Sequence, residues 1–329
     1  MKKLTVLSVA HFCVDMACAA LFFGWLGKST DWWLAMVLYN ACAFALQLPL
    51  GLLADRLNRN LSFAAAGCLL IAASFFLKGF PLPTAIVCGL GNGMFHVGGG
   101  LEVLNDSDTA APLGVFVSPG AEGLYLGTVG APLLLRCGWT MPLLLILTGA
   151  GLLIGKTTLV SSNVPLSLSL PKGDVFPLLC LFLVVTLRSL LSGAFSTGIN
   201  DLPGLIPVLC LAFGKAAGGF LGDRLGMRRA AILSLGAAAA LLLLPRGYLT
   251  LLALFLFNMT MPLTLFEAAR LLPGAKGAAF GLLTCALFFG MLPRFAGFAP
   301  TLPAFFWAGL VLLSLGLLWA GLRKEAAHG

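Results

Sequence analysis

The chain has 329 residues, of which 60% are hydrophobic and only 10% are charged, and its mean hydropathy is +1.02. Soluble domains are roughly 45–50% apolar and about 25% charged, so this composition excludes a soluble protein and indicates one that crosses a membrane many times. The net charge of +8 does not indicate a nucleic-acid partner, because the basic residues lie in short loops rather than in one patch. The nine cysteines form no CxxC pair or Cys/His pattern, so we expect neither a metal nor another cofactor.

Twelve segments of the chain are apolar enough to cross a lipid bilayer, since a transmembrane helix needs roughly 20 mainly apolar residues. The first six lie at about 4–26, 32–54, 61–78, 81–105, 111–135 and 138–156. The other six lie at about 174–196, 202–222, 230–245, 248–270, 277–298 and 301–322. We therefore expect an all-α integral membrane protein with twelve transmembrane helices in two six-helix bundles, 1–156 and 174–329, joined by a cytoplasmic linker at 157–173.

The basic residues are distributed unevenly between the two sides of these helices. With both termini in the cytoplasm, the inner set has thirteen members: Lys2, Lys3, Arg56, Arg59, Lys156, Lys172, Arg224, Arg228, Arg229, Arg270, Lys276, Arg323 and Lys324. The outer set has five: Lys28, Lys78, Arg136, Arg246 and Arg294. The positive-inside rule therefore predicts that both termini are cytoplasmic.

Two ten-residue loops repeat at corresponding places in the two halves of the chain. GLLADRLNRN (51–60) follows the second predicted span, and GFLGDRLGMR (219–228) follows the second span of the other half. Their aspartates, Asp55 and Asp223, are 168 residues apart, which is close to half the chain. Such a duplication is typical of secondary transporters.

The repeated pattern G-x-L-[AG]-D-R-x-[GN] resembles the signature loop of the major facilitator superfamily. The first copy departs from the family's pattern at Asn58, where glycine is usual, and at Asn60, where a basic residue is common. The resemblance implies a monomeric protein of the cell membrane that moves a small-molecule solute by alternating access between two bundles. It does not identify the solute.

Two further stretches resemble one branch of that superfamily, the fosmidomycin-resistance-like transporters. AHFCVDMACAALF (10–22) is similar to the branch's first helix, and GLGNGMFHVGGG (89–100) is similar to its fourth. This likeness implies a location in a bacterial inner membrane, and it favours export over uptake.

The charged residues of the repeated loops are candidates for a conformational gate. Asp55 and Asp223 are placed to accept backbone N–H bonds at the start of a neighbouring helix. The basic residues of the loops could pair with acids at nearby helix ends, such as Asp106 and Asp108; they are Arg56, Arg59, Arg224 and Arg228. The alternative interpretation is that these charges only fix the topology.

Polar residues in the first and fourth predicted spans are candidates for binding a proton or the solute. An ionisable group deep in a span costs about 2.5–3.5 kcal/mol on insertion scales, so a functional or tightly paired role is the default interpretation. His11 and Asp15 share a helix face, as do Asn92 and His96, because each pair is four residues apart. In the superfamily the first, fourth, seventh and tenth spans line the central cavity, so the resemblance places these residues together. A buried structural hydrogen bond is the alternative.

Two basic residues fall within predicted spans of the second half. Arg188 requires an anion, which is either a protein carboxylate such as Glu122 or the solute itself. Lys215 is expected to extend its amine to the inner surface of the membrane.

Two glutamates occupy nearly equivalent positions in the two halves. Glu102 is expected at the cytoplasmic end of the fourth span, against an arginine of an inner loop. Glu267 follows 165 residues later, so a paired gating role is expected for both. Pro262 predicts a kink near the middle of the tenth span.

These patterns together predict a proton-coupled secondary active transporter of a small organic solute, with export favoured. A facilitator or uptake permease is the alternative within transport. An enzyme is not expected, because H-E-x-x-H and similar catalytic motifs are absent from the sequence. A scaffold or receptor that transports nothing is the alternative from a different class.

Overall fold

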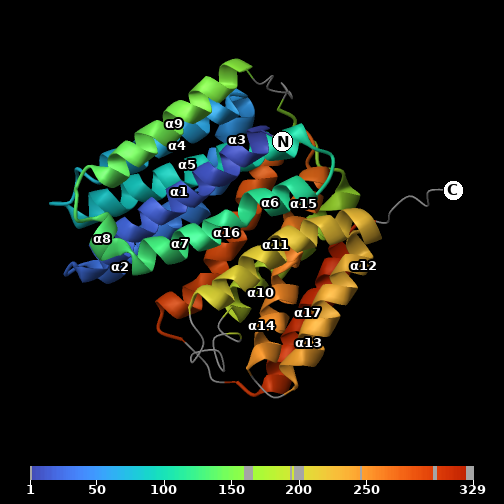
Figure 1. Cartoon of the computed structure of the whole chain (residues 1–329). Helices are drawn as coiled ribbons and strands as arrows, with labels where there is room; N and C mark the ends of the chain where they lie inside the picture. The colour runs from blue at the N-terminus through green and yellow to red at the C-terminus, as the bar shows by residue number, and fades with distance from the viewer. Residues whose placement is uncertain are drawn as a thin grey trace.

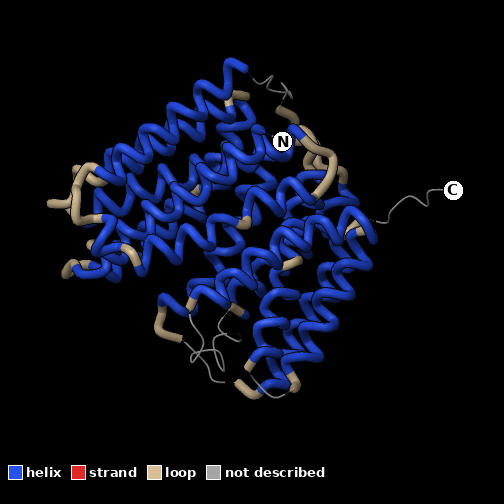
Figure 2. Tube along the Cα trace, viewed as in Figure 1, coloured by secondary structure: helices blue, strands red, loops and turns tan. Residues whose placement is uncertain are grey.

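The computed structural model describes residues 2–158, 166–192, 195, 204–244, 247–298 and 302–323. Within these ranges the chain consists of helices and connecting loops, with no strand (Figure 2). The expected all-α fold is therefore confirmed. The predicted linker falls partly on 159–165, which lie outside the described residues.

In the first half of the chain, helices occupy every predicted span. They are α1 (Lys2–Gly24), α2 (Trp32–Asn40), α3 (Gln47–Leu57), α4 (Asn60–Ser74), α5 (Pro81–Asp106), α6 (Ala111–Val117), α7 (Pro119–Val129), α8 (Ala131–Leu134) and α9 (Thr140–Thr158). A short 3-10 turn (Leu26–Lys28) follows α1, and a π-helical turn (Ala41–Ala45) joins α2 to α3.

The second half repeats this pattern. Its helices are α10 (Lys172–Leu191), α11 (Leu205–Leu225), α12 (Met227–Ala231), α13 (Ala237–Leu242), α14 (Tyr248–Asn258), α15 (Thr260–Leu271), α16 (Lys276–Phe295) and α17 (Ala304–Gly321). A π-helical turn (Ile232–Gly236) joins α12 to α13.

Seven helical segments among the described residues are long and apolar enough to cross a membrane, and two shorter ones are apolar. The protein is therefore a multi-pass membrane protein, while the count of twelve spans stays a prediction. Several predicted spans are interrupted in the structure. The tenth breaks at Met259, between α14 and α15. Pro262 explains this break, because proline has no N–H to donate to the carbonyl of Asn258.

Glycines bring the helices of the first half close together. A Cβ atom at Gly123 would collide with the carbonyl of Phe12, and one at Gly127 would collide with that of Met16. Helix α7 therefore lies directly against the backbone of α1. Glycine serves this purpose in membranes because small residues allow close van der Waals packing.

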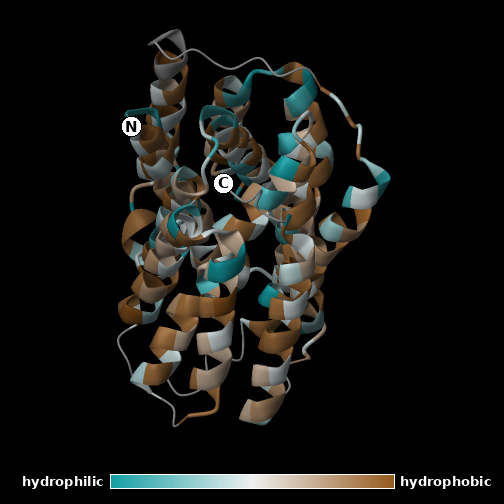
Figure 3. Cartoon of the chain, turned by 90° about the vertical axis from the view of Figure 1, so that its right-hand side faces the viewer, coloured by the Kyte–Doolittle hydropathy of each residue, from teal (hydrophilic) through white to brown (hydrophobic). Residues whose placement is uncertain are grey.

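The two halves of the chain meet along two pairs of elements. Helix α16 packs mainly against α3 and α5, and α11 packs against α6 and α7 (Figure 1). The ends of α1 and α17 that carry Lys3 and Arg323 lie at the same end of the molecule, which we call the terminal end. Figure 3 shows hydrophilic residues gathered mostly toward that end.

Candidate functional site

Helices α1 and α5 bring three titratable side chains together midway along their length. His11 Nε2 lies 3.2 Å from Asp15 Oδ2, and His96 Nε2 lies 3.5 Å from Asp15 Oδ1. The two imidazoles contact each other directly, with 2.9 Å between their Nε2 atoms. The sequence prediction that these residues share one place is therefore confirmed.

The other ring nitrogen of each histidine faces a backbone carbonyl. His11 Nδ1 lies 2.7 Å from the carbonyl oxygen of Phe116, and His96 Nδ1 lies 2.9 Å from that of Asn92. A carbonyl oxygen can only accept a hydrogen bond, so both Nδ1 atoms carry a proton. In a neutral imidazole the Nε2 atom then carries a lone pair.

The centre of this cluster consequently holds more acceptors than donors. Two Nε2 lone pairs and both oxygens of Asp15 converge, and the amide of Asn92 donates to Asp15 Oδ1 at 3.3 Å. Two nitrogen lone pairs at 2.9 Å repel each other unless a proton lies between them. The geometry therefore requires at least one bound proton or another cation.

A single metal ion could also meet this requirement. The ligand atoms of His11, Asp15 and His96 all lie within 4.8 Å of one another. However, a tetrahedral site with metal–nitrogen bonds of about 2.0–2.1 Å would place two nitrogens roughly 3.3 Å apart. The observed 2.9 Å matches a hydrogen bond instead. The arrangement fits a proton without rearrangement, and the expectation of no metal stays a prediction.

The cluster is enclosed on its third side by α7. A Cβ atom at Gly120 would collide with Asp15 Oδ2 and His11 Nε2. Sequence reasoning missed this glycine, because no local pattern indicates which side chain lies opposite it. Asp15 is 19% exposed, so the cluster is enclosed but not sealed.

Further charged groups surround the cluster. Lys215 on α11 lies within electrostatic reach of two carboxylates, Asp15 on α1 and Glu122 on α7. Tyr39 and Cys18 also lie near Asp15. Charges from both halves of the chain therefore act on the same site.

The position predicted for Lys215 is wrong. Its amine does not extend to the membrane surface; it donates a hydrogen bond of 3.2 Å to the carbonyl of Val117 in the other half. The short connection between α6 and α7 leaves that carbonyl available, because the helix is interrupted at Ser118.

Arg188 is not brought to a carboxylate. Among the described residues it forms no ion pair with Glu122, the internal partner that the sequence suggested. Within the described ranges, its Nη1 atom is buried without a hydrogen-bond partner, and so is Oε2 of Glu122.

The aspartates of the repeated loops bind helix starts in the opposite half. Asp55 accepts hydrogen bonds from the backbone N–H groups of Gly277 and Ala278, at 2.9 and 2.8 Å. Asp223 accepts bonds from Ala110 and Ala111, both at 2.8 Å. The predicted interaction with a neighbouring helix start is confirmed for both residues. At the terminal end, these bonds tie the two halves together reciprocally.

The basic residues of these loops do not pair as predicted. Among the described residues, Arg56, Arg59 and Arg224 form no ion pair within 4.0 Å. Arg228 donates to the carbonyl of Leu322 at 2.7 Å and lies over the ring of Trp319.

Of the two acids suggested as their partners, Asp106 lies 3.2 Å from Lys3 instead. Asp108 lies within electrostatic reach of Lys276.

The two matched glutamates each bind a basic group of their own half. Glu102 lies 2.7 Å from Lys3 and accepts a bond from Asn60, so the expected inner-loop arginine is not its partner. Glu267 lies 3.0 Å from Arg270 and accepts a bond from the backbone of Arg323. Sequence reasoning missed Lys3, although its place at the chain start was the available signal.

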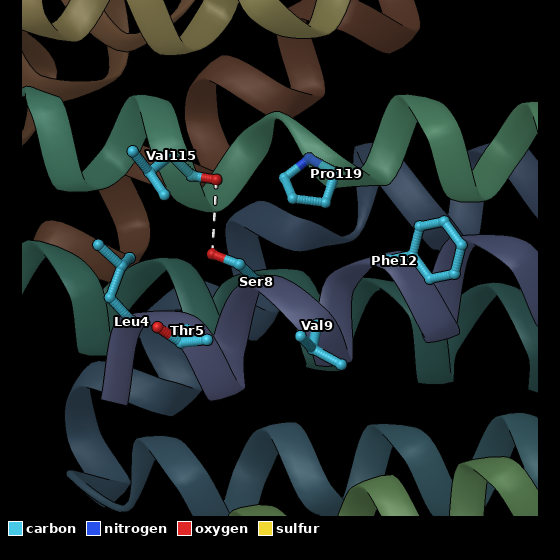
Figure 4. A pocket seen from close by; sticks show the side chains of 7 residues that line it. All are labelled: Leu4, Thr5, Ser8, Val9, Phe12, Val115 and Pro119. Carbon is cyan, nitrogen blue, oxygen red and sulfur yellow. Dashed lines mark hydrogen bonds between the residues drawn. The ribbon is translucent and has the colours of Figure 1, made fainter. Parts of the chain in front are cut away.

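A groove on the surface of α1 lies behind the cluster. It has a volume of about 460 Å³, and its lining is mostly apolar (Figure 4). Its polar contact is weak, with Ser8 donating to the carbonyl of Val115 at 3.4 Å. None of the titratable residues of the cluster lines it, so the groove is separate from the cluster.

Solved structures of major facilitator superfamily transporters share this fold. The E. coli fucose:proton symporter FucP matches with a TM-score of 0.72 and 13% identity, over 98% of this chain and 99% of that chain. The human organic anion transporter MFSD10 matches with a TM-score of 0.71 and 17% identity, over 96% and 98%. A bacterial homologue of the iron transporter ferroportin matches with 0.63 and 16%, over 97% of each chain.

At these identities the likeness concerns the fold. The protein therefore has the fold of a major facilitator superfamily transporter. No family model and no curated protein matches the sequence.

Proposed function

We propose that this protein is a proton-coupled secondary active transporter of a small organic solute, and that it belongs to the major facilitator superfamily. Its fold is the fold of transporters, including a proton symporter. In the proposed cycle, the bundles 1–156 and 174–329 rock against each other around a central site. Both termini face the cytoplasm, as the distribution of basic residues favours.

One observation carries the proposal of proton coupling. The Nε2 atoms of His11 and His96 face each other at 2.9 Å, while both Nδ1 protons are committed to backbone carbonyls. One proton between the imidazoles, balanced by the carboxylate of Asp15, satisfies the cluster. Because histidine titrates near neutral pH in water, such a site can load and release a proton under physiological conditions.

The site and the gate play separate parts in this cycle. His11, Asp15, Asn92 and His96 belong to one half of the chain and keep their contacts when the halves move. Asp55 and Asp223 bond across the halves, so their bonds break when the terminal end opens. The proton site can thereby face each side of the membrane in turn without being rebuilt.

Proteoliposome flux tests the proposal. Purified protein is reconstituted with an imposed pH gradient, and a panel of labelled organic solutes is offered on either side. We expect accumulation of at least one solute, abolished by a protonophore. Flux that ignores the pH gradient would instead support a facilitator, and no flux of any solute would support a scaffold or receptor.

The same vesicles report the direction of transport, because the labelled solute is offered on either side of the membrane. Export is the direction that the likeness of the first and fourth spans to the fosmidomycin-resistance-like branch favours.

A metal-binding measurement tests whether the cluster holds a proton. If Zn²⁺ or Mn²⁺ binds with micromolar affinity and displaces protons, the coupling ion of this proposal would be a metal ion instead of a proton.

A further inference from the structure

Arg188 is buried in the second half of the chain, and no carboxylate among the described residues pairs with it. It is 7% exposed, and its Nη1 atom has no hydrogen-bond partner. A guanidinium is always charged, and taking it out of water without a counter-charge is costly. Its neighbour Ser189 donates to the carbonyl of Leu287, which fixes α10 against α16 and holds Arg188 in place.

A second cation lies close to the first. Lys215 is within electrostatic reach of Arg188, of Asp15 and of Glu122. In the described part of the chain, none of these carboxylates lies within 4.0 Å of either cation. Asp15 is already engaged by the two histidines and by Asn92.

The charges around the site do not cancel once the proton is bound. From α1 and α7 come the negative charges of Asp15 and Glu122, and from α10 and α11 come the positive charges of Arg188 and Lys215. Among the described residues, these charges balance while His11 and His96 on α1 and α5 are neutral. A proton on the histidine pair leaves one positive charge in excess, in surroundings where net charge is expensive.

We propose that the solute is an organic monoanion whose acidic group binds Arg188 and Lys215. A guanidinium presents a planar fork that matches a carboxylate, and the lysine amine adds a second, single contact. The inference rests on the proposed transport function and names the class of solute. Because the anion removes the excess charge, the proton and the solute favour each other's binding, and this effect is reciprocal. Such coupling is that of symport, so this inference favours the uptake alternative over the export that the sequence likeness favours.

Equilibrium binding tests this without transport. The full chain in lipid nanodiscs is titrated with monocarboxylates from acetate to octanoate and with benzoate, each paired with its neutral amide. We expect at least one carboxylate to bind while its amide does not. Arg188→Gln should weaken that binding about 10- to 100-fold, as loss of a charge-assisted hydrogen bond implies. Arg188→Lys should be intermediate, because it keeps the charge and loses the fork.

Two variants serve as comparisons. Arg294→Gln removes an exposed arginine of α16 and should leave binding unchanged. Glu122→Gln should strengthen carboxylate binding, because it removes a competing negative charge near Lys215. Carboxylate affinity should fall as a rising pH removes the proton from the histidine pair, and His96→Ala should remove that dependence.

Several results would overturn the inference. They are the absence of binding by every carboxylate, equal binding of carboxylate and amide, and binding that Arg188→Gln leaves unchanged. If Arg188→Gln does not fold, the carboxylate affinities of Arg188→Lys and Glu122→Gln test the inference in its place. Flux of a neutral solute driven by a pH gradient would overturn the anion inference and uphold proton-coupled transport, so the two failures are distinguishable.

Discussion

The mid-membrane cluster and the caps at the terminal end use carboxylates in opposite ways. Asp15 is bound by side chains of its own half, within 3.2 to 3.5 Å of two imidazoles. Asp55 and Asp223 are bound by backbone N–H groups of the other half, at 2.8 to 2.9 Å. Contacts inside one half survive a rocking motion, whereas contacts between halves must break and form again.

This difference assigns separate consequences to damage in the two regions. Loss of the cluster should remove the coupling and leave the motion. Loss of a cap should alter the motion and leave the affinity for solute. Variants in each region therefore test this division.

Removing a member of the cluster should abolish coupling. Asp15→Asn removes the charge that balances the bound proton, and His96→Ala removes one of the two nitrogens that share it. Each variant should lose all accumulation driven by a pH gradient in proteoliposomes, while its yield and size-exclusion profile stay those of the folded protein. Unchanged coupling in both variants would remove these residues from the mechanism.

Gly120→Ala should damage the same cluster without changing any titratable group. Its Cβ atom would collide with Asp15 and His11, so the carboxylate and the imidazole must shift from their present positions. We expect pH-driven flux to fall tenfold or more, about 1.4 kcal/mol in the barrier. Gly151→Ala on α9 is the matched control, because its Cβ would meet no atom within 4 Å. Equal flux in the two variants would contradict the geometry of the cluster.

The sequence predicted the cluster better than its surroundings. Helical spacing placed His11 with Asp15 and Asn92 with His96, because contacts four residues apart are local. The meeting of the two pairs followed from the resemblance and is confirmed by the 2.9 Å contact. Neither the tautomers nor Gly120 could be predicted, because they depend on where Phe116 and α7 lie in space.

Errors arose where a long side chain had several possible partners. The caps by Asp55 and Asp223 were predicted because a short carboxylate at a helix end has few alternatives. Lys215 was placed at the surface, yet its amine reaches the other half. The carboxylate of Glu102 binds Lys3 rather than an arginine. Such pairings depend on tertiary distances that spacing along a helix does not contain.

Removing a cap should slow the conformational change. An N-terminal cap contributes about 0.5–2 kcal/mol to the state that must form again in each cycle, so Asp223→Ala should lower the turnover rate by roughly 2- to 30-fold. Solute affinity measured by equilibrium binding should not change. Asp31→Ala is the control, because Asp31 precedes α2 without a side-chain cap bond.

Glu102→Gln sharpens this test, because Glu102 lies at the same end but binds Lys3 of its own half. It should lower the thermal stability and leave the turnover rate of the remaining folded protein close to normal. A loss of affinity in Asp223→Ala, or slowed turnover in Glu102→Gln equal to that of Asp223→Ala, would contradict the division between the two regions.

The prediction with the smallest effect on transport concerns which side of the membrane the caps of Asp55 and Asp223 face. Cys137 lies in the loop between α8 and α9, and it is exposed, whereas the other cysteines are buried or half-buried. This loop is at the end opposite the terminal end, since Leu135 beside it packs against Gly24 at the far end of α1. If the termini are cytoplasmic, a membrane-impermeant maleimide should label Cys137 on intact cells without affecting transport.

The chemistry of this thiol provides an internal check on the label. A hydrogen bond with the Thr140 side chain, followed by one from the backbone of Trp139, lowers the pKa of Cys137 below its usual value. The reactive thiolate is therefore more abundant at pH 7 than for an ordinary cysteine. Thr140→Val should raise the pKa and slow labelling at pH 7, and the difference should vanish above the ordinary pKa, where both thiols are ionised. Cys137→Ser should abolish labelling. Labelling only after permeabilisation would place the caps of Asp55 and Asp223 on the outer side and reverse the assignment of the gate.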